Sequence, residues 1–196
     1  MREELLELLK RDAYRQGQFT LSSGATSKHY VNCKPVTLNG KGLFYTSCLL
    51  LECVEEDTVA VAGLTLGADP LVSGVVTVSA ADEVDLDGLI IRKEPKGHGT
   101  QSQIEGPVLP KGAKVTVLED VTTTGQSALK AVYVLRDAGY VVDRVVTIVD
   151  RKDYDCRAIM EQEGLDFISL FTIDDLAKWN CSKTYDYSWQ LRRYHS

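Results

Sequence analysis

Two adjacent acids followed by a loop of small residues form the stretch of the sequence best suited to chemistry. Glu119 and Asp120 come directly after the apolar run 115–118, and a segment rich in Thr, Gly and Ser then leads into a helical pattern. Small residues let such a segment aim several backbone N–H groups into one concavity, and a helix start adds partial positive charge, so the segment suits a phosphate. The acids would repel a phosphate and would instead accept hydrogen bonds from sugar hydroxyls or orient water on a divalent cation. The pattern therefore predicts a site for a ribose 5-phosphate.

A simpler interpretation is that the hydroxyl side chains of this loop only cap the helix that follows. Capping does not require two acids at the end of a buried strand, so their presence favours a ligand site. The glycine-rich fingerprints of dinucleotide-binding and P-loop proteins are absent, because the sequence contains neither GxGxxG nor GK followed by Ser or Thr.

A second candidate is the basic segment that follows Arg92. Lys93, Lys96 and His98 lie within residues 93–107, which also contain three glycines and two prolines. This composition does not sustain a helix or a strand, so it predicts a mobile surface loop. In a chain with a net charge of −6, such a basic loop suits a lid that closes over a diphosphate. The alternative is a solvated loop with ordinary surface lysines.

Short apolar runs interleaved with amphipathic stretches predict an α/β protein. The runs are residues 58–62, 86–91, 114–118, 145–149 and 167–171. Because they are mostly apolar and do not alternate, they indicate a central parallel sheet of about five strands with helices on both faces. A helix is also expected over 41–55, with Phe44, Cys48, Leu51 and Val54 facing inward. The polar candidates stand at strand ends, and ligands of such sheets gather beyond the carboxyl ends of the strands.

Length, charge and cysteine content narrow the class of protein further. The chain has 196 residues, which suits a single domain. Its 22 Lys and Arg against 28 Asp and Glu argue against binding to nucleic acid or to an anionic membrane. No apolar run approaches the roughly 20 residues that cross a bilayer. The five cysteines include no CxxC pair, which favours a reducing, cytoplasmic location.

These motifs together resemble a known family. The stretch 119–127 is similar to the phosphoribosyl-diphosphate signature of the type I phosphoribosyltransferases. Within that class the chain resembles the orotate phosphoribosyltransferases at segments 19–24, 63–70, 92–99 and 171–176, in the family's order. The first signature is shared by many phosphoribosyltransferases, whereas the motif RKE-x-K-x-HG at 92–99 points to the orotate enzymes.

The resemblance implies the type I phosphoribosyltransferase fold in one domain, residues 1–196. A small hood is expected over about 1–40, the core over about 41–176 and a C-terminal tail over 177–196. The implied reaction transfers ribose 5-phosphate from phosphoribosyl diphosphate to orotate, which gives orotidine 5′-monophosphate and diphosphate.

The resemblance also implies roles for individual residues. Lys93, Lys96 and His98 are expected to be catalytic. The residues implied to bind phosphoribosyl diphosphate are Arg92, Lys93, Lys96, His98, Glu119, Asp120, Val121, Thr122, Thr123, Thr124, Gly125, Gln126 and Ser127. Mg²⁺ is expected near Asp120, held through substrate and water without a direct protein ligand. A homodimer is expected, in which the loop 93–107 is shared across the subunits.

Three residues are expected at the orotate. Arg151 follows a buried strand, and its planar guanidinium matches a carboxylate with two parallel hydrogen bonds. An ion pair of Arg151 with Asp150 or Asp153 is the alternative. The resemblance implies a contact from Thr123, and it places Tyr30 where some members stack an aromatic ring on the base. The alternative for Tyr30 is a half-buried strand tyrosine.

Two positions depart from the family pattern. Ser22 and Gly67 stand where many members have lysines that touch the substrates. Their loss leaves two other functions open. One is a phosphoribosyltransferase for another base, such as a purine, and the other is a non-catalytic sensor paralogue with the same fold.

Overall fold

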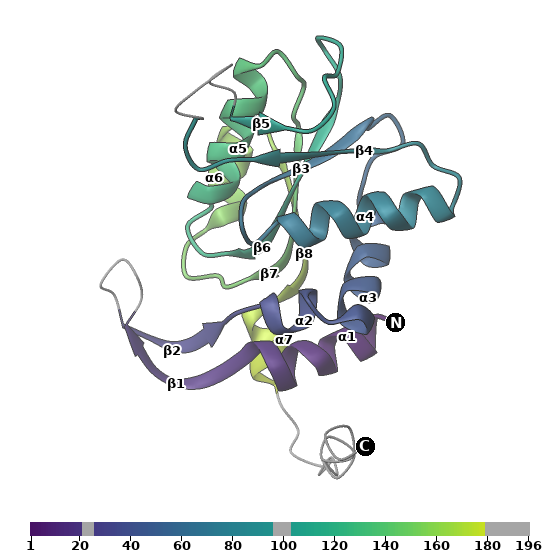
Figure 1. Cartoon of the computed structure of the whole chain (residues 1–196). Helices are drawn as coiled ribbons and strands as arrows, with labels where there is room; N and C mark the ends of the chain where they lie inside the picture. Colours follow the sequence, from purple (N-terminus) through teal and green to yellow (C-terminus); the bar gives the residue numbers. More distant parts are fainter. Residues whose placement is uncertain (21–25, 96–102, 179–196) are drawn as a thin grey trace.

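A six-stranded sheet forms the centre of the protein in the computed structural model, which describes residues 1–20, 26–95 and 103–178 (Figure 1). The strand order is β5-β4-β3-β6-β7-β8. The strands are β3 (Ala60–Leu64), β4 (Asp87–Ile91), β5 (Ile104–Glu105), β6 (Val115–Thr122), β7 (Arg144–Asp150) and β8 (Asp166–Thr172). All neighbouring strands except β4 and β5 pair in parallel. The predicted parallel sheet of about five strands is therefore confirmed.

The sixth strand, β5, corrects the prediction for the basic segment. The loop 93–107 was expected to contain no strand, but Ile104 and Glu105 pair antiparallel with Ile91 and Ile90 of β4. The backbone N–H of Arg92 also donates to the carbonyl of Gln103 at 2.8 Å. The edge of β4 offers unpaired backbone groups, and residues 103–105 contain no Gly or Pro to prevent the pairing. The prediction of an irregular loop was wrong at this end of the segment.

Helices cover both faces of the sheet, as the apolar strands require. On one face α3 (Gly40–Leu51) and α4 (Asp69–Ala81) pack in one core with Leu118 and Ile148. On the other face α5 (Gln126–Asp137) and α6 (Cys156–Gln162) pack in a second core with side chains of β3, β6 and β7. Figure 1 shows the two pairs of helices on opposite sides of the strands. No helix among the described residues is long and apolar enough to cross a membrane.

The inward face of α3 differs from the expected one. Phe44 is 52% exposed, whereas the buried residues of the helix include Thr46 and Ser47. The reason is a close approach to α4, since a Cβ built on Gly74 would lie 2.2 Å from the Ser47 Oγ. Small side chains allow that approach, so the helix turns its small face inward. Its start is capped by Asn39, whose Oδ1 accepts from two backbone N–H groups at 3.1 Å each.

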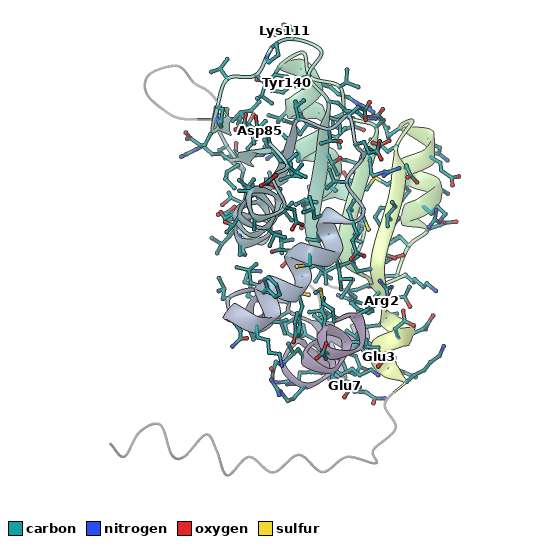
Figure 2. All side chains as sticks on the ribbon, turned by 90° about the vertical axis from the view of Figure 1, so that its right-hand side faces the viewer. Arg2, Glu3, Glu7, Asp85, Lys111 and Tyr140 are labelled. Carbon is teal, nitrogen blue, oxygen red and sulfur yellow. The ribbon has the colours of Figure 1, made fainter. Side chains whose placement is uncertain are left out.

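The N-terminal segment folds as a small layer across the carboxyl ends of the parallel strands. It comprises α1 (Arg2–Leu8), the π-helical turn η1 (Leu9–Ala13), β1 (Tyr14–Thr20), β2 (Thr26–Val31) and α2 (Lys34–Thr37). We call residues 1–40 the hood. The helix α7 (Ile173–Ala177), which follows β8, lies beside it (Figure 1). In Figure 2, Arg2, Glu3 and Glu7 mark the hood end of the molecule, and Lys111 and Tyr140 mark the opposite end.

Candidate active site

The two acids at the end of β6 lie between the sheet and the hood. Glu119 is 6% exposed, and one of its carboxylate oxygens accepts the backbone N–H of Asp120 at 3.2 Å. Its other oxygen, Oε2, is buried without a hydrogen-bond partner. Asp120 Oδ1 accepts the backbone N–H of Val121 at 2.9 Å. A buried carboxylate oxygen without a donor is unusual, so Oε2 is an open acceptor position at this site.

Burial and the neighbouring acid change the proton affinity of Glu119. Burial is the larger cause, and the Asp120 carboxylate adds to it, so that the pKa of Glu119 rises to about 8. A ligand-free Glu119 is therefore mostly protonated at neutral pH. In that form it can donate as well as accept a hydrogen bond.

The loop between β6 and α5 is shaped by one glycine and by α6 beneath it. Gly125 precedes α5 and has a left-handed backbone with φ = 78°, which favours glycine. A Cβ on Gly125 would lie 2.9 Å from the Met160 side chain. The thiol of Cys156 donates to the carbonyl of Thr123 at 3.2 Å. Gly125 itself offers no capping side chain, but the Thr124 hydroxyl accepts the backbone N–H of Gln126, the first residue of α5, at 3.4 Å, so the capping that the sequence left as an alternative is present in part.

The basic residues begin at the same carboxyl edge of the sheet as the acids, but on a different strand. Arg92 and Lys93 follow β4 and are exposed, and one strand, β3, separates β4 from β6. Arg92 pairs with Glu105 at 3.5 Å, and the Gln103 amide donates to the carbonyl of Arg92 at 3.1 Å. Lys96 and His98 lie outside the described residues. The structure therefore places the base of the segment and leaves the roles of its cations as predictions.

Arg151 joins the end of β7 to the hood. It is 6% exposed, and one terminal nitrogen, Nη2, lies 2.8 Å from Asp153 Oδ2. The same nitrogen lies 3.0 Å from Ser27 Oγ and 3.3 Å from the His29 carbonyl, both on β2. The ion pair that the sequence left as an alternative is thus present. The Nε–H of Arg151 is buried without an acceptor, which leaves one donor for a ligand.

The other two residues expected at the orotate lie on the elements next to Arg151. Tyr30 is on β2, 43% exposed, with its ring 5.4 Å from that of Phe19. Thr123 lies in the β6–α5 loop and is partly buried. Both stay predictions as ligands of the base.

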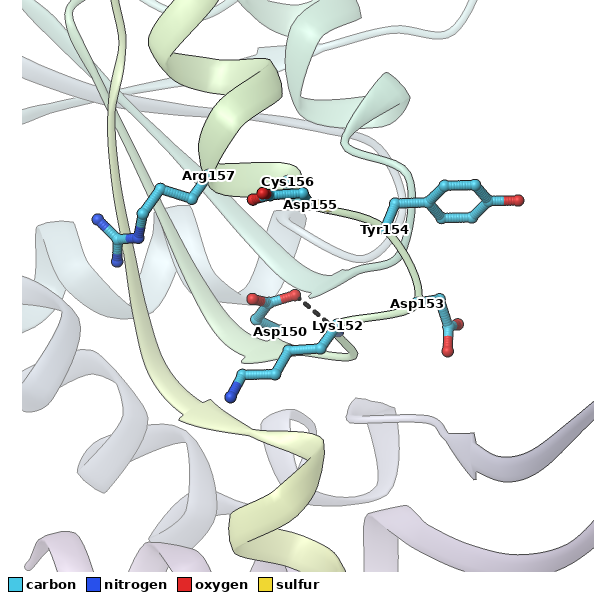
Figure 3. A pocket seen from close by; sticks show the side chains of 7 residues that line it. All are labelled: Asp150, Lys152, Asp153, Tyr154, Asp155, Cys156 and Arg157. Atoms are coloured by element: carbon cyan, nitrogen blue, oxygen red, sulfur yellow. Dashed lines mark hydrogen bonds between the residues drawn. The ribbon is translucent and has the colours of Figure 1, made fainter.

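A cavity of about 420 Å³ lies in the loop that follows Arg151. Figure 3 shows the side chains around it, which are Asp150, Lys152, Asp153, Tyr154, Asp155, Cys156 and Arg157. The Asp150 carboxylate accepts the backbone N–H of Lys152 at 2.9 Å, and this bond closes the turn after β7. The cavity therefore borders the end of the sheet where Arg151 and the acids lie.

Lys34 and Gly67 both lie beside the Asp120 carboxylate. The sequence predicted no role for Lys34, and Gly67 is one of the two departures from the family pattern. The Lys34 ammonium lies 3.4 Å from Asp120 Oδ2, although the two residues are 86 positions apart. A Cβ on Gly67 would lie 2.6 Å from Asp120 Oδ1, so a side chain there would displace the carboxylate. No local sequence pattern predicts the contact of Lys34 with Asp120, because this contact depends on how the hood packs on the core.

Solved structures with the same fold define the class of protein. A phosphoribosyltransferase from Corynebacterium diphtheriae matches with a TM-score of 0.78 at 38% identity, covering 90% of this chain and 98% of that one. An orotate phosphoribosyltransferase from Mycobacterium tuberculosis, solved with phosphoribosyl diphosphate, matches with a TM-score of 0.72 at 35% identity, covering 90% and 98%. The mostly parallel sheet with helices on both faces is that of a type I phosphoribosyltransferase.

Sequence relatives identify the family within that class. The orotate phosphoribosyltransferase of Thermosynechococcus vestitus is 58% identical over 176 residues, which cover 90% of this chain and 93% of the relative. No family model matches the chain. The chain belongs to the orotate phosphoribosyltransferase family and transfers ribose 5-phosphate from phosphoribosyl diphosphate to orotate, as the resemblance implied. The alternatives of another base and of a non-catalytic sensor are not adopted.

Proposed function

We propose that phosphoribosyl diphosphate binds at the carboxyl edge of the sheet, with its ribose hydroxyls on Glu119 and Asp120 and its 5′-phosphate in the loop 123–127. The observation that carries this assignment is the buried Glu119 Oε2, which has no donor within the described protein. It lies within β6, which ends at Thr122, and the loop that follows this strand leads into the start of α5. A sugar hydroxyl would satisfy the oxygen, and the backbone N–H groups of the loop and helix start would bind the phosphate.

The reaction needs positive charge more than it needs a protein nucleophile. As diphosphate leaves C1′, negative charge develops on the leaving group and positive charge on the ribose ring. Cations placed for that transition state lower the barrier. We assign this task to Lys93, Lys96 and His98, with Arg92 binding the diphosphate at the base of the loop. The family's reaction and the concentration of cations in one segment of an acidic chain support this proposal.

The residues present fit a Mg²⁺ ion that is held through substrate and water. Among residues 1–20, 26–95 and 103–178, no three His, Cys, Asp or Glu side chains come together as a metal cluster. Carboxylates are the oxygen ligands that Mg²⁺ prefers, but an ammonium already lies 3.4 Å from Asp120 Oδ2. Asp120 and Glu119 would therefore hold the ion's water and the ribose hydroxyls. When bound, Mg²⁺ supplies charge that neutralises the diphosphate.

We assign orotate to Arg151, with Thr123 and Tyr30 beside it. The guanidinium is held in place from one side by Asp153 and by two groups of β2. Its Nε–H faces a buried region without an acceptor, and an orotate oxygen would supply one. The Asp153 carboxylate lies 2.8 Å from the guanidinium. Arg151 is therefore already placed to bind one carboxylate, the group that orotate also carries.

The Arg151 assignment is tested by comparing the two substrates. We expect Arg151→Lys to raise the KM for orotate by about tenfold or more, because the Nε–H donor that the guanidinium keeps for a ligand is lost. The KM for phosphoribosyl diphosphate should stay within about twofold, because Arg151 is assigned to orotate and not to this substrate. Steady-state rates, followed by the loss of orotate absorbance, give both values.

Asp153→Asn is the matched control, because it breaks the ion pair and leaves the guanidinium in place. Binding of orotate should be kept or improved in this variant. If Arg151→Lys and Asp153→Asn impaired both substrates alike, Arg151 would be a structural ion-pair partner and its assignment to orotate would be refuted.

We also propose a cytoplasmic homodimer in which the loop 93–107 of one subunit serves the active site of the other. The loop leaves the sheet from its outer edge, at β4 and β5, rather than from its centre. A loop anchored there is placed to reach a neighbouring molecule. The cytoplasmic location is favoured by five cysteines that form no CxxC pair.

A further inference from the structure

The Asp120 carboxylate is held from several sides before any substrate binds. Its Oδ1 accepts the backbone N–H of Val121 at 2.9 Å, and its Oδ2 lies 3.4 Å from the Lys34 ammonium. Gly67 approaches the same carboxylate closely enough that a Cβ there would lie 2.6 Å from Oδ1. The Asp120 side chain is only 13% exposed. Its orientation is therefore set by the hood and the β3–α4 loop together with its own strand.

Lys34 reaches Asp120 from a fixed position in the hood. It is the first residue of α2, and its backbone N–H donates to the Asn32 side chain at 3.2 Å. The preceding residue, Cys33, is fully buried, with its thiol 3.8 Å from the backbone carbonyl of Asp120. Two consecutive hood residues thus contact one residue of β6. Asp120 is the more buried partner of the ion pair, since its side chain is 13% exposed and that of Lys34 is 40% exposed.

We propose that Lys34 is a positioning residue for ribose recognition, and that its ammonium holds the Asp120 carboxylate in the orientation that accepts the ribose hydroxyls. This inference rests on the proposed assignment of Glu119 and Asp120 to the ribose. A carboxylate oxygen has two acceptor positions, so Asp120 can keep the ammonium while it accepts a hydroxyl.

The kinetic test replaces Lys34 with Met, which keeps the length of the side chain and removes the charge. We expect the KM for phosphoribosyl diphosphate to rise by about tenfold, the size of effect that a charge-assisted hydrogen bond carries. The KM for orotate and kcat at saturating phosphoribosyl diphosphate should change by less than about twofold, because Lys34 is proposed to act only through the carboxylate that binds the ribose. Lys34→Arg should restore most of the loss. The matched control is Lys41→Met, since Lys41 is exposed, with its ammonium over the Tyr45 ring.

A binding test separates positioning from a general weakening of the hood. Lys34→Met should bind ribose 5-phosphate more weakly than the parent, whereas inorganic phosphate, which has no hydroxyls for Asp120, should bind equally well to both. Isothermal titration gives the two affinities. Equal weakening for both probes would mean that the hood itself had been disturbed, and the inference would be overturned.

A double variant distinguishes failure of this inference from failure of the proposed site. If Lys34 acts through Asp120, Lys34→Met should add little to the defect of Asp120→Asn. Additive losses would mean that Lys34 touches the substrate itself, which overturns a positioning role. A normal Lys34→Met beside an impaired Asp120→Asn would overturn this inference alone. A normal Asp120→Asn would overturn the ribose assignment on which the inference rests.

Discussion

Glu119 combines deep burial with an unpaired oxygen and a raised pKa, a combination that costs stability in the ligand-free protein. Its pKa rises from 4.5 to about 8 because of burial and of the Asp120 carboxylate. Between these two values the folded state binds a proton that the unfolded state has released. The contribution of Glu119 to the free energy of unfolding is therefore present below about pH 4.5 and is lost progressively as the pH rises to about 8.

Glu119→Gln should remove this pH dependence. At pH 9 we expect the ligand-free variant to be more stable than the parent by about 1–3 kcal/mol, because a buried charge without a partner is removed. At pH 4.5 the two should be nearly equal. The KM for phosphoribosyl diphosphate should rise, since an acceptor for the ribose is weakened. Urea denaturation at the two pH values measures the stabilities.

The control for this experiment is Glu161→Gln, which changes an exposed glutamate of α6. An unchanged pH dependence in Glu119→Gln would contradict the raised pKa as a cost to the folded state. The result would then place the source of any alkaline destabilisation elsewhere in the protein.

At the scale of elements, the β6–α5 connection depends on support from a neighbouring helix. Gly125 has φ = 78°, and α6 lies so close that a Cβ there would meet the Met160 side chain at 2.9 Å. The thiol of Cys156 holds the carbonyl of Thr123 from the same helix. The loop therefore takes its shape from two elements, its own glycine and the packing of α6.

A pair of glycine substitutions separates backbone strain from packing. Gly112 has φ = 80°, close to that of Gly125, but a Cβ there would have nothing within 4 Å. We expect both Gly112→Ala and Gly125→Ala to lower the free energy of unfolding by about 1–2 kcal/mol, because both place a Cβ in the left-handed region. Only Gly125→Ala should also weaken phosphoribosyl diphosphate, because its methyl group pushes on the loop.

Thermal unfolding and the KM for phosphoribosyl diphosphate distinguish the two effects. Unchanged substrate binding in Gly125→Ala would argue that the exact shape of this loop is unimportant for the 5′-phosphate. A comparable loss of binding in Gly112→Ala would argue that the effect is one of global stability.

At the scale of the whole molecule, the site is assembled from the hood and one edge of the sheet. Arg151 binds two groups of β2, and Asp120 meets Lys34 of α2, so both contacts hold the hood across the strand ends. The basic loop begins on the other side of the acids, at β4. A dimer that brings the loop of a second subunit over this site would complete it.

Mixing two inactive variants tests the shared loop. Lys96→Ala removes a cation of the loop, and Asp120→Asn removes an acid of the site, so each should lose at least about tenfold in turnover. Random reassociation of the two would place an intact loop over an intact acidic pair in one of the two sites of each mixed dimer. Activity should then recover to about a quarter of the parent value, if subunits pair at random in a two-fold dimer. Activity that stays at the sum of the separate variants would show that the loop serves its own subunit.

Much of the core and part of the site could be predicted because the relevant residues are contiguous. A parallel strand buried on both faces is an apolar run in the sequence, so all five parallel strands could be located. The stretch 119–127 is likewise local, since a strand, its acids and the following loop are consecutive residues. The face of α3 was predicted wrongly, because close packing against α4 favours Ser47 over the larger Phe44.

By itself, the sequence determined the parallel sheet, its polar strand ends and the family, because each of these depends on short runs of consecutive residues. The tertiary structure decided which distant residues meet at the site. Lys34 and Asp120 are 86 positions apart, and Arg151 and Ser27 are 124 apart. The two-residue strand β5 also depends on a free sheet edge rather than on its own sequence. Such contacts arise from how whole elements pack, and side-chain periodicity along one segment carries no information about the partner it will meet.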